Sequence, residues 1–356
     1  MTIKPKLISL GVKVPTHCYT QREVFDTIGY SEGYWRLFGT AGIDQRFFCI
    51  PLEEAVKLSF QEQQERYKEH AVRLSVDAIT RALDGRDIKN VSCLIFGSCT
   101  GVLPGPTAAD YISSELGMAK YTEKYNNTGM GCGAAFPGLK HAYDYVRSTG
   151  GYALAVNCEL SSLAYFPENP KPDAENSYEL LRANAIFADM AAAALIGPDI
   201  EDDDWRHPYI LDTEVNYEHE YADDLGFIWR DGRLRCRLSR RVPQLAPIAT
   251  KPAVDVVLQR NDLKVEDIDH WVIHAAGNSV INNIARSLNL PEEKLTLSRE
   301  TLRLCGNTSS TSVMVTGKRL MEQNIKPGEM VAMIAIGPGM YGSCSLFQFP
   351  FVEGKK

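Results

Sequence analysis

The chain has 356 residues, 44% hydrophobic and 23% charged, so it can form one large or two fused domains around a sizeable core. Its net charge of −7 argues against nucleic acid or an anionic membrane as the main partner. The N-terminal stretch lacks a signal-peptide pattern, and no stretch approaches the roughly 20 apolar residues of a membrane span.

The nine cysteines are scattered along the chain, and none forms a CxxC pair. An odd number of cysteines without metal-ligand spacing indicates reduced thiols, because a disulfide framework or a zinc site needs paired spacings. We therefore expect no metal site and a cytoplasmic location.

The N-terminal part alternates between strand-like and helix-like segments. Residues 6–14 predict a first strand, and residues 53–84 have the composition of a long helix. An apolar strand over 91–99 comes next, and a loop rich in glycine and proline follows it. This order is typical of α/β folds.

The glycine-rich segment GMGCGA (129–134) leads into the next predicted helix. Apolar Leu139, Ala142 and Val146 recur at three- and four-residue steps in it, and an apolar strand follows at 152–160. Cys132 therefore stands at or near a helix N-terminus. There the free N–H groups and the helix dipole lower the pKa of a thiol and favour a nucleophile. The alternative is a buried structural cysteine.

The C-terminal part repeats the earlier pattern. The segments that begin at Val76 and Val254 both run through a helix, Asp-Ile and an apolar strand to small residues. Cys132 and Asn307 each open a helix of small residues that leads to an apolar strand, and both pairs have nearly the same separation. We therefore predict an internal duplication with mainly parallel sheets covered by helices.

His274 ends the predicted strand 270–274, at the edge of an α/β sheet where ligands gather. Together with Cys132 and Asn307 it makes a candidate catalytic set, because a base or hydrogen-bond donor beside a thiol activates it. Taken separately, a histidine that ends an apolar strand can be a satisfied core residue, and Asn307 can be a helix N-cap.

Two other motifs lead to interpretations that we reject. Residues 337–342 match GxGxxG, but the segment after them is strand-like, whereas a dinucleotide-binding fingerprint must open a helix. A cysteine, histidine and asparagine also occur in papain-like proteases, but the local signature of those enzymes is missing around Cys132.

Seven segments spread over nearly the whole chain share one resemblance. They are FGTAGIDQRFF (38–48), SCTG (98–101), GMGCGA (129–134), NAIFADMAAAALIG (184–197), WVIHAAG (271–277), CGNTSS (305–310) and AIGPGM (335–340). In combination they resemble the thiolase-fold condensing enzymes, specifically the chalcone-synthase-like type III polyketide synthases, with ketoacyl-ACP synthase III as a near relative.

The resemblance implies a duplicated thiolase fold, a five-layer αβαβα architecture with two mixed, mainly parallel sheets. An N-terminal half over 1–200 would carry Cys132, and a C-terminal half over 201–356 would carry His274 and Asn307. The resemblance also implies a homodimer, with an acyl carrier protein as a possible further partner.

The resemblance further implies an activity. Cys132 would take an acyl group from a CoA or carrier-protein thioester. His274 and Asn307 would bind the thioester carbonyl of a malonyl-type extender and stabilise the enolate that decarboxylation leaves. Attack of this carbanion on the Cys132 thioester is a decarboxylative Claisen condensation, which needs no metal or redox cofactor.

Several pocket positions follow from the same resemblance. Phe187 matches a gatekeeper phenylalanine and Ser309 a cavity-lining serine, and a second gatekeeper phenylalanine would fall at Cys236. The smaller cysteine would admit a longer or aliphatic acyl chain. The remaining pocket positions are Cys99, Thr100, Gly337, Pro338 and Gly339.

Three alternatives stay open at this point. The enzyme could join two preformed β-ketoacyl chains, or it could be an acyltransferase or hydrolase on the same fold. A non-catalytic subunit would be expected to lack one of Cys132, His274 and Asn307, and all three are present.

Overall fold

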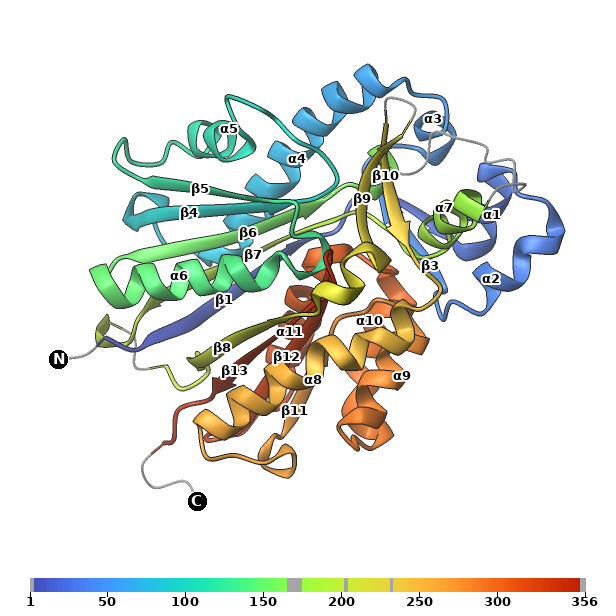
Figure 1. Cartoon of the computed structure of the whole chain (residues 1–356). Helices are drawn as coiled ribbons and strands as arrows, with labels where there is room; N and C mark the ends of the chain where they lie inside the picture. The colour runs from blue at the N-terminus through green and yellow to red at the C-terminus, as the bar shows by residue number, and fades with distance from the viewer. Residues whose placement is uncertain (1–2, 165–174, 202–203, 231–232, 353–356) are drawn as a thin grey trace.

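The computed structural model describes residues 3–164, 175–201, 204–230 and 233–352 (Figure 1). Its strands are β1 (Pro5–Lys13), β2 (His17–Thr20), β3 (Gln45–Phe48), β4 (Val91–Ser98), β5 (Glu123–Thr128), β6 (Tyr152–Glu159), β7 (Met190–Pro198), β8 (Tyr209–Tyr217), β9 (Leu225–Arg230), β10 (Arg233–Leu238), β11 (His270–Ile273), β12 (Met330–Gly337) and β13 (Tyr341–Gln348). Its α-helices are α1 (Gln21–Ile28), α2 (Trp35–Gly39), α3 (Leu52–Ala55), α4 (Phe60–Leu83), α5 (Ala108–Glu115), α6 (Ala135–Thr149), α7 (Glu175–Ile186), α8 (Val242–Arg260), α9 (Asn278–Ser287), α10 (Thr296–Cys305) and α11 (Ser312–Met321).

The long helix predicted over 53–84 is divided into α3 and α4. Ser59 caps α4: its side chain accepts a hydrogen bond from the backbone N–H of Glu62, and the carboxylate of Glu62 accepts one from the backbone N–H of Ser59. This capping box starts a new helix inside the charged stretch. The strands predicted at 6–14, 91–99, 152–160 and 270–274 agree with β1, β4, β6 and β11 to within a residue at either end.

The nine-stranded sheet has the order β11-β12-β13-β8-β1-β7-β6-β4-β5. Within it the order β4-β6-β7-β1 recurs as β11-β12-β13-β8, and the first pair of each set is parallel while the next two are antiparallel. The two sets meet where Lys6 of β1 pairs with Tyr209 of β8. This repeated order agrees with the predicted duplication. The boundary at residue 200 stays a prediction.

The expected predominance of parallel pairing is wrong, and the two expected sheets are joined. Among neighbouring strands of the large sheet, only β11–β12, β4–β5 and β4–β6 are parallel. Alternation of strands and helices gives parallel pairs only where a helix crosses between sheet neighbours. The tight turn 338–340 instead joins β12 to β13 as a hairpin, and β7 lies antiparallel between β6 and β1.

Successive side chains of a buried strand point to opposite faces of the sheet, so each face packs against its own layer of helices. One face of β4, β6 and β7 packs with α4 in one core, and the opposite face packs with α6 and α11 in a second core. The other end of the sheet shares the second core through β12 and packs against α8 and α9 on its outer face. Figure 1 shows α6 between the strands β4–β7 and the strands β8 and β13. This is the predicted order of α, β, α, β and α layers.

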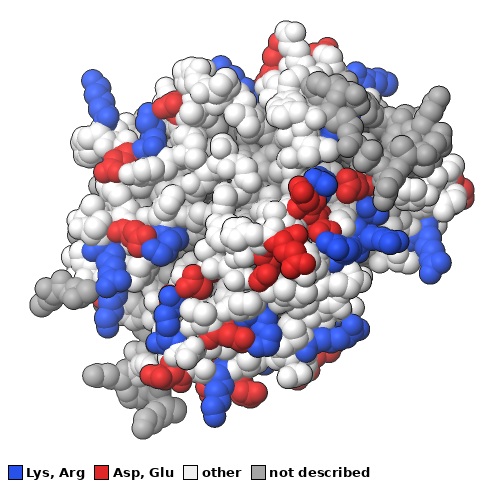
Figure 2. Space-filling model, viewed as in Figure 1, with Lys and Arg blue, Asp and Glu red and all other residues white. Residues whose placement is uncertain are grey.

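Small residues let these layers approach closely. A Cβ at Gly11 of β1 would lie 2.1 Å from the carbonyl oxygen of Ala78 in α4, so α4 can rest on β1 only because position 11 is glycine. No helix in the described ranges is both long and apolar enough to cross a membrane. On the face in Figure 2, described acidic and basic side chains are interspersed, without one extended basic field.

Candidate active site

Cys132 lies in a short 3-10 turn, Gly131–Gly133, directly before α6. A Cβ at Gly131, whose φ is +49°, would lie 2.4 Å from the ring of Pro338, and a Cβ at Gly133 would lie 1.9 Å from the hydroxyl of Tyr341. That hydroxyl donates a 3.1 Å hydrogen bond to the carbonyl of Met130. The glycines around Cys132 are therefore required because the β12–β13 turn packs directly on this loop.

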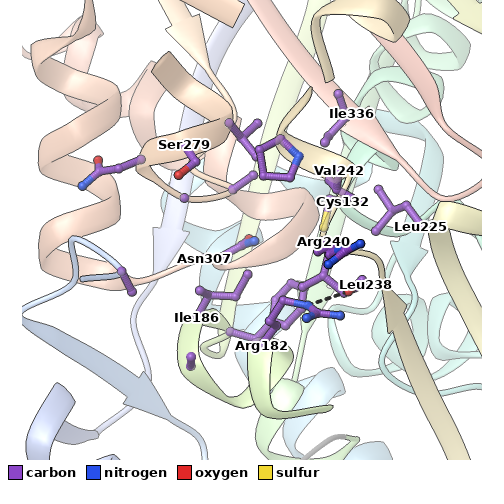
Figure 3. A pocket seen from close by; sticks show the side chains of 18 of the residues that line it. Cys132, Arg182, Ile186, Leu225, Leu238, Arg240, Val242, Ser279, Asn307 and Ile336 are labelled. Carbon is purple, nitrogen blue, oxygen red and sulfur yellow. Dashed lines mark hydrogen bonds between the residues drawn. The ribbon is translucent and has the colours of Figure 1, made fainter. Parts of the chain in front are cut away.

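Cys132, His274 and Asn307 line one cavity of about 380 Å³ (Figure 3). Figure 3 shows Cys132 and Asn307 facing the same space, with Ile336 and Leu225 contributing apolar wall. All three polar residues are buried, with exposed fractions of 7%, 1% and 2% in that order. The volume is in the range of small-molecule sites in proteins.

The thiol of Cys132 is protonated in this environment. Burial raises the pKa of Cys132 to about 12, and a 3.4 Å hydrogen bond from Ser309 Oγ opposes this rise. We expected a lowered pKa from the helix N-terminus. The thiol is almost completely buried, and removal of water disfavours the charged thiolate.

His274 follows β11 directly, and its backbone N–H donates a 2.8 Å hydrogen bond to the carbonyl of Ile334 on β12. Burial lowers the pKa of His274 to about 3, so the imidazole is neutral at physiological pH. Its Nδ1 lies in hydrogen-bond contact with Ser312 Oγ. Its Nε2 has no hydrogen-bond partner among the residues that the structure describes.

Asn307 is held on both sides by the backbone at the end of α7. Its N–H donates to the carbonyl of Ile186 at 2.8 Å, and its own carbonyl accepts from Ala188 at 3.0 Å. Its Oδ1 accepts from the N–H of Ser309 at 2.9 Å, but the N-cap of the 3-10 turn Ser309–Thr311 is Thr308, so Asn307 is not the helix cap that the sequence also allowed. The amide NH₂ is then available as a hydrogen-bond donor at the cavity.

A fully buried arginine supports the segment that holds Asn307. Arg46 of β3 donates from Nη1 to the carbonyls of Asn184 and Phe187 at 2.7 and 2.8 Å. A Cβ at Gly306 would lie 2.8 Å from the side chain of Arg46. Phe187, a predicted pocket residue, also lines the cavity and forms a parallel bridge with Asn307.

A buried carboxylate lies behind the nucleophile, and the sequence analysis missed it. Glu159 ends β6 and accepts hydrogen bonds from the backbone of Cys99, from the hydroxyl of Thr100 and from the hydroxyl of Ser310. Burial raises the pKa of Glu159. An acidic residue at the end of an apolar strand was the signal in the sequence.

Four of the predicted pocket residues lie at or directly behind the main cavity. Phe187 lines the cavity. Cys99 and Ser309 lie behind it: their side chains are 3.6 Å apart, and Ser309 reaches Cys132. Thr100 belongs to the network around Glu159.

The other predicted pocket positions do not line the main cavity. Cys236 is buried in β10, within electrostatic reach of Cys132. Pro338 and Gly339 line a neighbouring cavity of about 340 Å³ on the far side of the Cys132 loop, and Gly337 packs against Tyr341. Ile336, one residue earlier, lines the main cavity instead, because side chains alternate along β12.

Two arginines stand at the same cavity, on α7 and just after β10 (Figure 3). Arg182 donates from Nε to the carbonyl of Leu238 at 2.8 Å. Burial lowers the pKa of Arg182, and the neighbouring charge of Arg240 adds to this effect. Neither guanidinium forms an ion pair with a residue in the described ranges.

Comparisons with known protein families match most of the chain in two pieces. Residues 50–200 match the N-terminal domain of chalcone and stilbene synthases. Residues 258–349 match the C-terminal domain of 3-oxoacyl-[acyl-carrier-protein] synthase III.

Curated relatives align over more than three quarters of their length. The chain is 27% identical to 3,5-dihydroxyphenylacetyl-CoA synthase of Streptomyces toyocaensis, over 97% of this chain and 90% of the relative. It is 26% identical to a putative chalcone synthase of Bacillus subtilis, over 96% and 98%. It is 28% identical to the α-pyrone synthesis polyketide synthase-like Pks18 of Mycobacterium tuberculosis, over 86% and 77%.

Solved structures share the fold. PKS-I of the brown alga Ectocarpus siliculosus superposes with a TM-score of 0.87 at 24% identity, covering 98% of this chain and 99% of that one. The 1,3,6,8-tetrahydroxynaphthalene synthase of Streptomyces coelicolor gives 0.87 at 23% identity, over 98% and 100%. The thiolase architecture predicted from the sequence is confirmed at the level of the fold.

Proposed function

Because this chain belongs to the chalcone and stilbene synthase family of type III polyketide synthases, we propose that it extends an aliphatic acyl chain by decarboxylative condensation, with Cys132 as the nucleophile. Members of this family are acyltransferases that form carbon–carbon bonds, and they use CoA thioesters without a further cofactor. The family therefore supplies the reaction class, and the residues and the acyl chain are our proposal.

One observation carries the assignment of residues. A thiol, an imidazole and a carboxamide from three distant segments line a single cavity, and the buried Nε2 of His274 has no partner among the described residues. Leaving buried donors unpaired costs free energy, so such donors usually serve a ligand.

In the first half-reaction, we propose that the Cys132 sulfur adds to the carbonyl of an acyl-CoA. The carbon–sulfur bond to CoA then breaks, and CoA leaves as its free thiol with the proton that Cys132 carried. The acyl group stays on Cys132 as a thioester. Because burial raises the pKa of Cys132 to about 12, the sulfur starts this step as a thiol, and its proton leaves with CoA.

In the second half-reaction, a malonyl thioester binds with its carbonyl oxygen at His274 Nε2 and the Asn307 amide. Its carboxylate leaves as CO₂, and the electron pair of the broken bond forms an enolate whose oxygen these donors stabilise. The enolate carbon attacks the acyl carbonyl on Cys132. The carbon–sulfur bond to Cys132 breaks, the thiol regains a proton, and the chain is longer by two carbons.

The aliphatic acyl chain follows from the lining of the site. Ala185, Ile186, Leu225 and Leu238 contribute apolar walls to the cavity. By resemblance Cys236 stands where a bulkier gatekeeper would, and it is buried in the same packed core as Cys132, so we propose that the end of the acyl chain lies on the Cys236 side of the site. A long apolar chain would bury its methylene groups there at about 0.8 kcal/mol each.

The two arginines at the cavity are evidence that the acyl group arrives on a phosphorylated carrier. Arg182 and Arg240 stand at the cavity without an ion-pair partner among the described residues, and Arg182 keeps free Nη donors because only its Nε is used by Leu238. Guanidinium groups bind phosphates through such paired donors. We propose that they take a phosphate of CoA or of a carrier protein's phosphopantetheine.

Further parts of the proposal concern assembly and location. We propose a cytoplasmic homodimer with halves 1–200 and 201–356. The strand β5 closes one edge of the large sheet and is mostly exposed, which supports a partner there. Buried free cysteines, eight of nine, support a reducing compartment.

The test uses purified enzyme with a series of straight-chain acyl-CoAs and malonyl-CoA. We expect mass spectrometry to find the acyl group on the peptide that contains Cys132, and we expect products longer by whole two-carbon units. In Cys132→Ala, acylation should vanish. An intact acyl adduct in that variant would refute the assignment, and products without a new carbon–carbon bond would favour the hydrolase alternative.

A further inference from the structure

Ser312 is the first residue of α11, and its hydroxyl contacts His274 Nδ1. Both side chains are almost completely buried, with exposed fractions of 0% and 1%. The contact joins the end of β11 to the start of α11, so the fold of the C-terminal half fixes it. The resemblance to type III polyketide synthases assigned a role to His274 and none to Ser312.

Hydrogen-bond accounting determines which group donates. A buried serine hydroxyl carries one proton and needs an acceptor for it. The usual acceptor within a helix is the carbonyl four residues earlier, and the carbonyl of Thr308 already accepts from the hydroxyl of Thr311 at 2.8 Å. Among the described residues, His274 Nδ1 is the hydrogen-bond partner of Ser312 Oγ.

Donation by Ser312 has a consequence on the other side of the ring. A neutral imidazole carries its single proton on one nitrogen and accepts at the other. If Nδ1 accepts from Ser312, the proton lies on Nε2, the nitrogen that has no partner among the described residues and belongs to a residue of the cavity wall.

We propose that Ser312 is a positioning residue that holds His274 in the tautomer with hydrogen on Nε2. This inference rests on the proposed function, in which His274 donates to the thioester oxygen. In the opposite tautomer, Nε2 would present a lone pair to that oxygen and repel the enolate as it forms. Ser312 thus acts on the decarboxylation half-reaction through His274, without touching the substrate.

Measuring the rates of the two half-reactions separately distinguishes this positioning role from a merely structural one, because a structural defect would slow both. Acyl transfer to Cys132 is followed by mass spectrometry, and decarboxylation is followed as CO₂ released from malonyl-CoA. In Ser312→Ala we expect the rate of decarboxylation to fall about tenfold or more while the rate of acylation of Cys132 is unchanged. Ser312→Thr keeps the hydroxyl and should restore decarboxylation.

The matched control is Ser345→Ala. Ser345 is a buried serine whose hydroxyl lies 2.9 Å from that of Thr213, away from the cavity residues. It should lose a similar hydrogen bond without any change in the ratio of the two half-reactions. A thermal melt of each variant reports whether the fold is intact.

A measurement without turnover reads the tautomer itself. In ¹⁵N-histidine-labelled wild type, with the resonance assigned by its absence in His274→Ala, Nδ1 of His274 should have the shift of a non-protonated nitrogen and Nε2 that of a protonated one. A protonated Nδ1 would overturn the proposal. Equal loss of both half-reactions in Ser312→Ala would also overturn it.

The experiments give a different result if the proposed function itself is wrong. Wild-type enzyme would then neither load an acyl group on Cys132 nor release CO₂ from malonyl-CoA. If wild type does both and Ser312→Ala keeps full decarboxylation, the role of Ser312 alone is wrong.

Discussion

Ser309 Oγ donates a 3.4 Å hydrogen bond to Sγ of Cys132. This contact links the start of the 3-10 turn after Asn307 with the loop before α6, two segments that the duplication relates to each other. It opposes the effect of burial, since a hydrogen bond to a thiolate favours the charged form and so lowers the pKa of Cys132.

Ser309→Ala should therefore raise the pKa of Cys132 above its value of about 12. The thiolate fraction at any pH below that value falls by the same factor, so alkylation by iodoacetamide should slow several-fold between pH 8 and 10. Ser345→Ala is the control, because the hydroxyl of Ser345 contacts that of Thr213, away from Cys132. A Ser309→Ala enzyme that reacts as fast as wild type would contradict this role.

Asn307→Asp keeps the size of the side chain and removes its NH₂ donors. Decarboxylation of malonyl-CoA should fall by about 10²–10³-fold, because a carboxylate cannot donate to the enolate oxygen and adds negative charge beside it. Acyl loading of Cys132 should survive at least in part, and the same split is expected for His274→Ala. Normal CO₂ release in both variants would count against both residues.

Cys236→Phe should shorten the accepted acyl chains. Cys132 and Cys236 belong to one packed core, so the larger phenyl ring should push neighbouring side chains toward the cavity and leave less room for the terminal methylenes of the longest substrates. The product profile over acyl-CoAs of increasing length measures this, and Cys236→Ser, of nearly equal volume, is the control. An unchanged profile would show that the end of the chain lies elsewhere.

Removing the two arginines at the cavity should weaken the binding of phosphorylated substrates and leave the binding of others unchanged. In Arg182→Ala/Arg240→Ala we expect KM for acyl-CoA to rise about tenfold, whereas KM for the acyl-N-acetylcysteamine thioester, which has no phosphate, should not change. Arg237→Ala is the control, because Arg237 is paired with Asp223 and does not line the main cavity. If both thioesters lose affinity equally, the arginines do not bind phosphate.

Assaying the same double variant with an acylated carrier protein distinguishes the two sources of phosphate. A selective loss with acyl-CoA would identify CoA as the partner of the arginines. A selective loss with the carrier protein would identify phosphopantetheine.

Arg46→Met should lower the free energy of unfolding by about 2–6 kcal/mol. It leaves the carbonyls of Asn184 and Phe187 without their buried donor, and each such group costs about 1–3 kcal/mol. Urea titration measures the change. The partly conservative Arg46→Lys should lose less stability, since the ammonium can still donate to one of the two carbonyls; a loss as large as in Arg46→Met would contradict the argument.

The local patterns in the sequence were sufficient for several strands and for three residues that line the cavity. Cys132, His274 and Asn307 each stand at the end of a predicted buried element beside glycines or small residues, which is a signal that can be found without knowing what packs nearby. The repeat of helix, Asp-Ile and strand also predicted the duplication, because it is a property of chain order.

What the sequence did not determine depends on contacts between distant segments. The pKa of Cys132 is raised instead of lowered because residues from other elements remove water from it. Gly337, Pro338 and Gly339 miss the main cavity because their position is set by the β12–β13 hairpin and its packing on the Cys132 loop.

The sequence by itself determined the alternation of strands and helices, the duplication and the three polar residues, since each is written in local composition and spacing. Only the tertiary structure decided the direction of strand pairing, the protonation of the thiol and the partners of Arg46, Glu159 and Ser312. Desolvation and hydrogen bonding are properties of the neighbours that folding brings together, and those neighbours lie far apart along the chain.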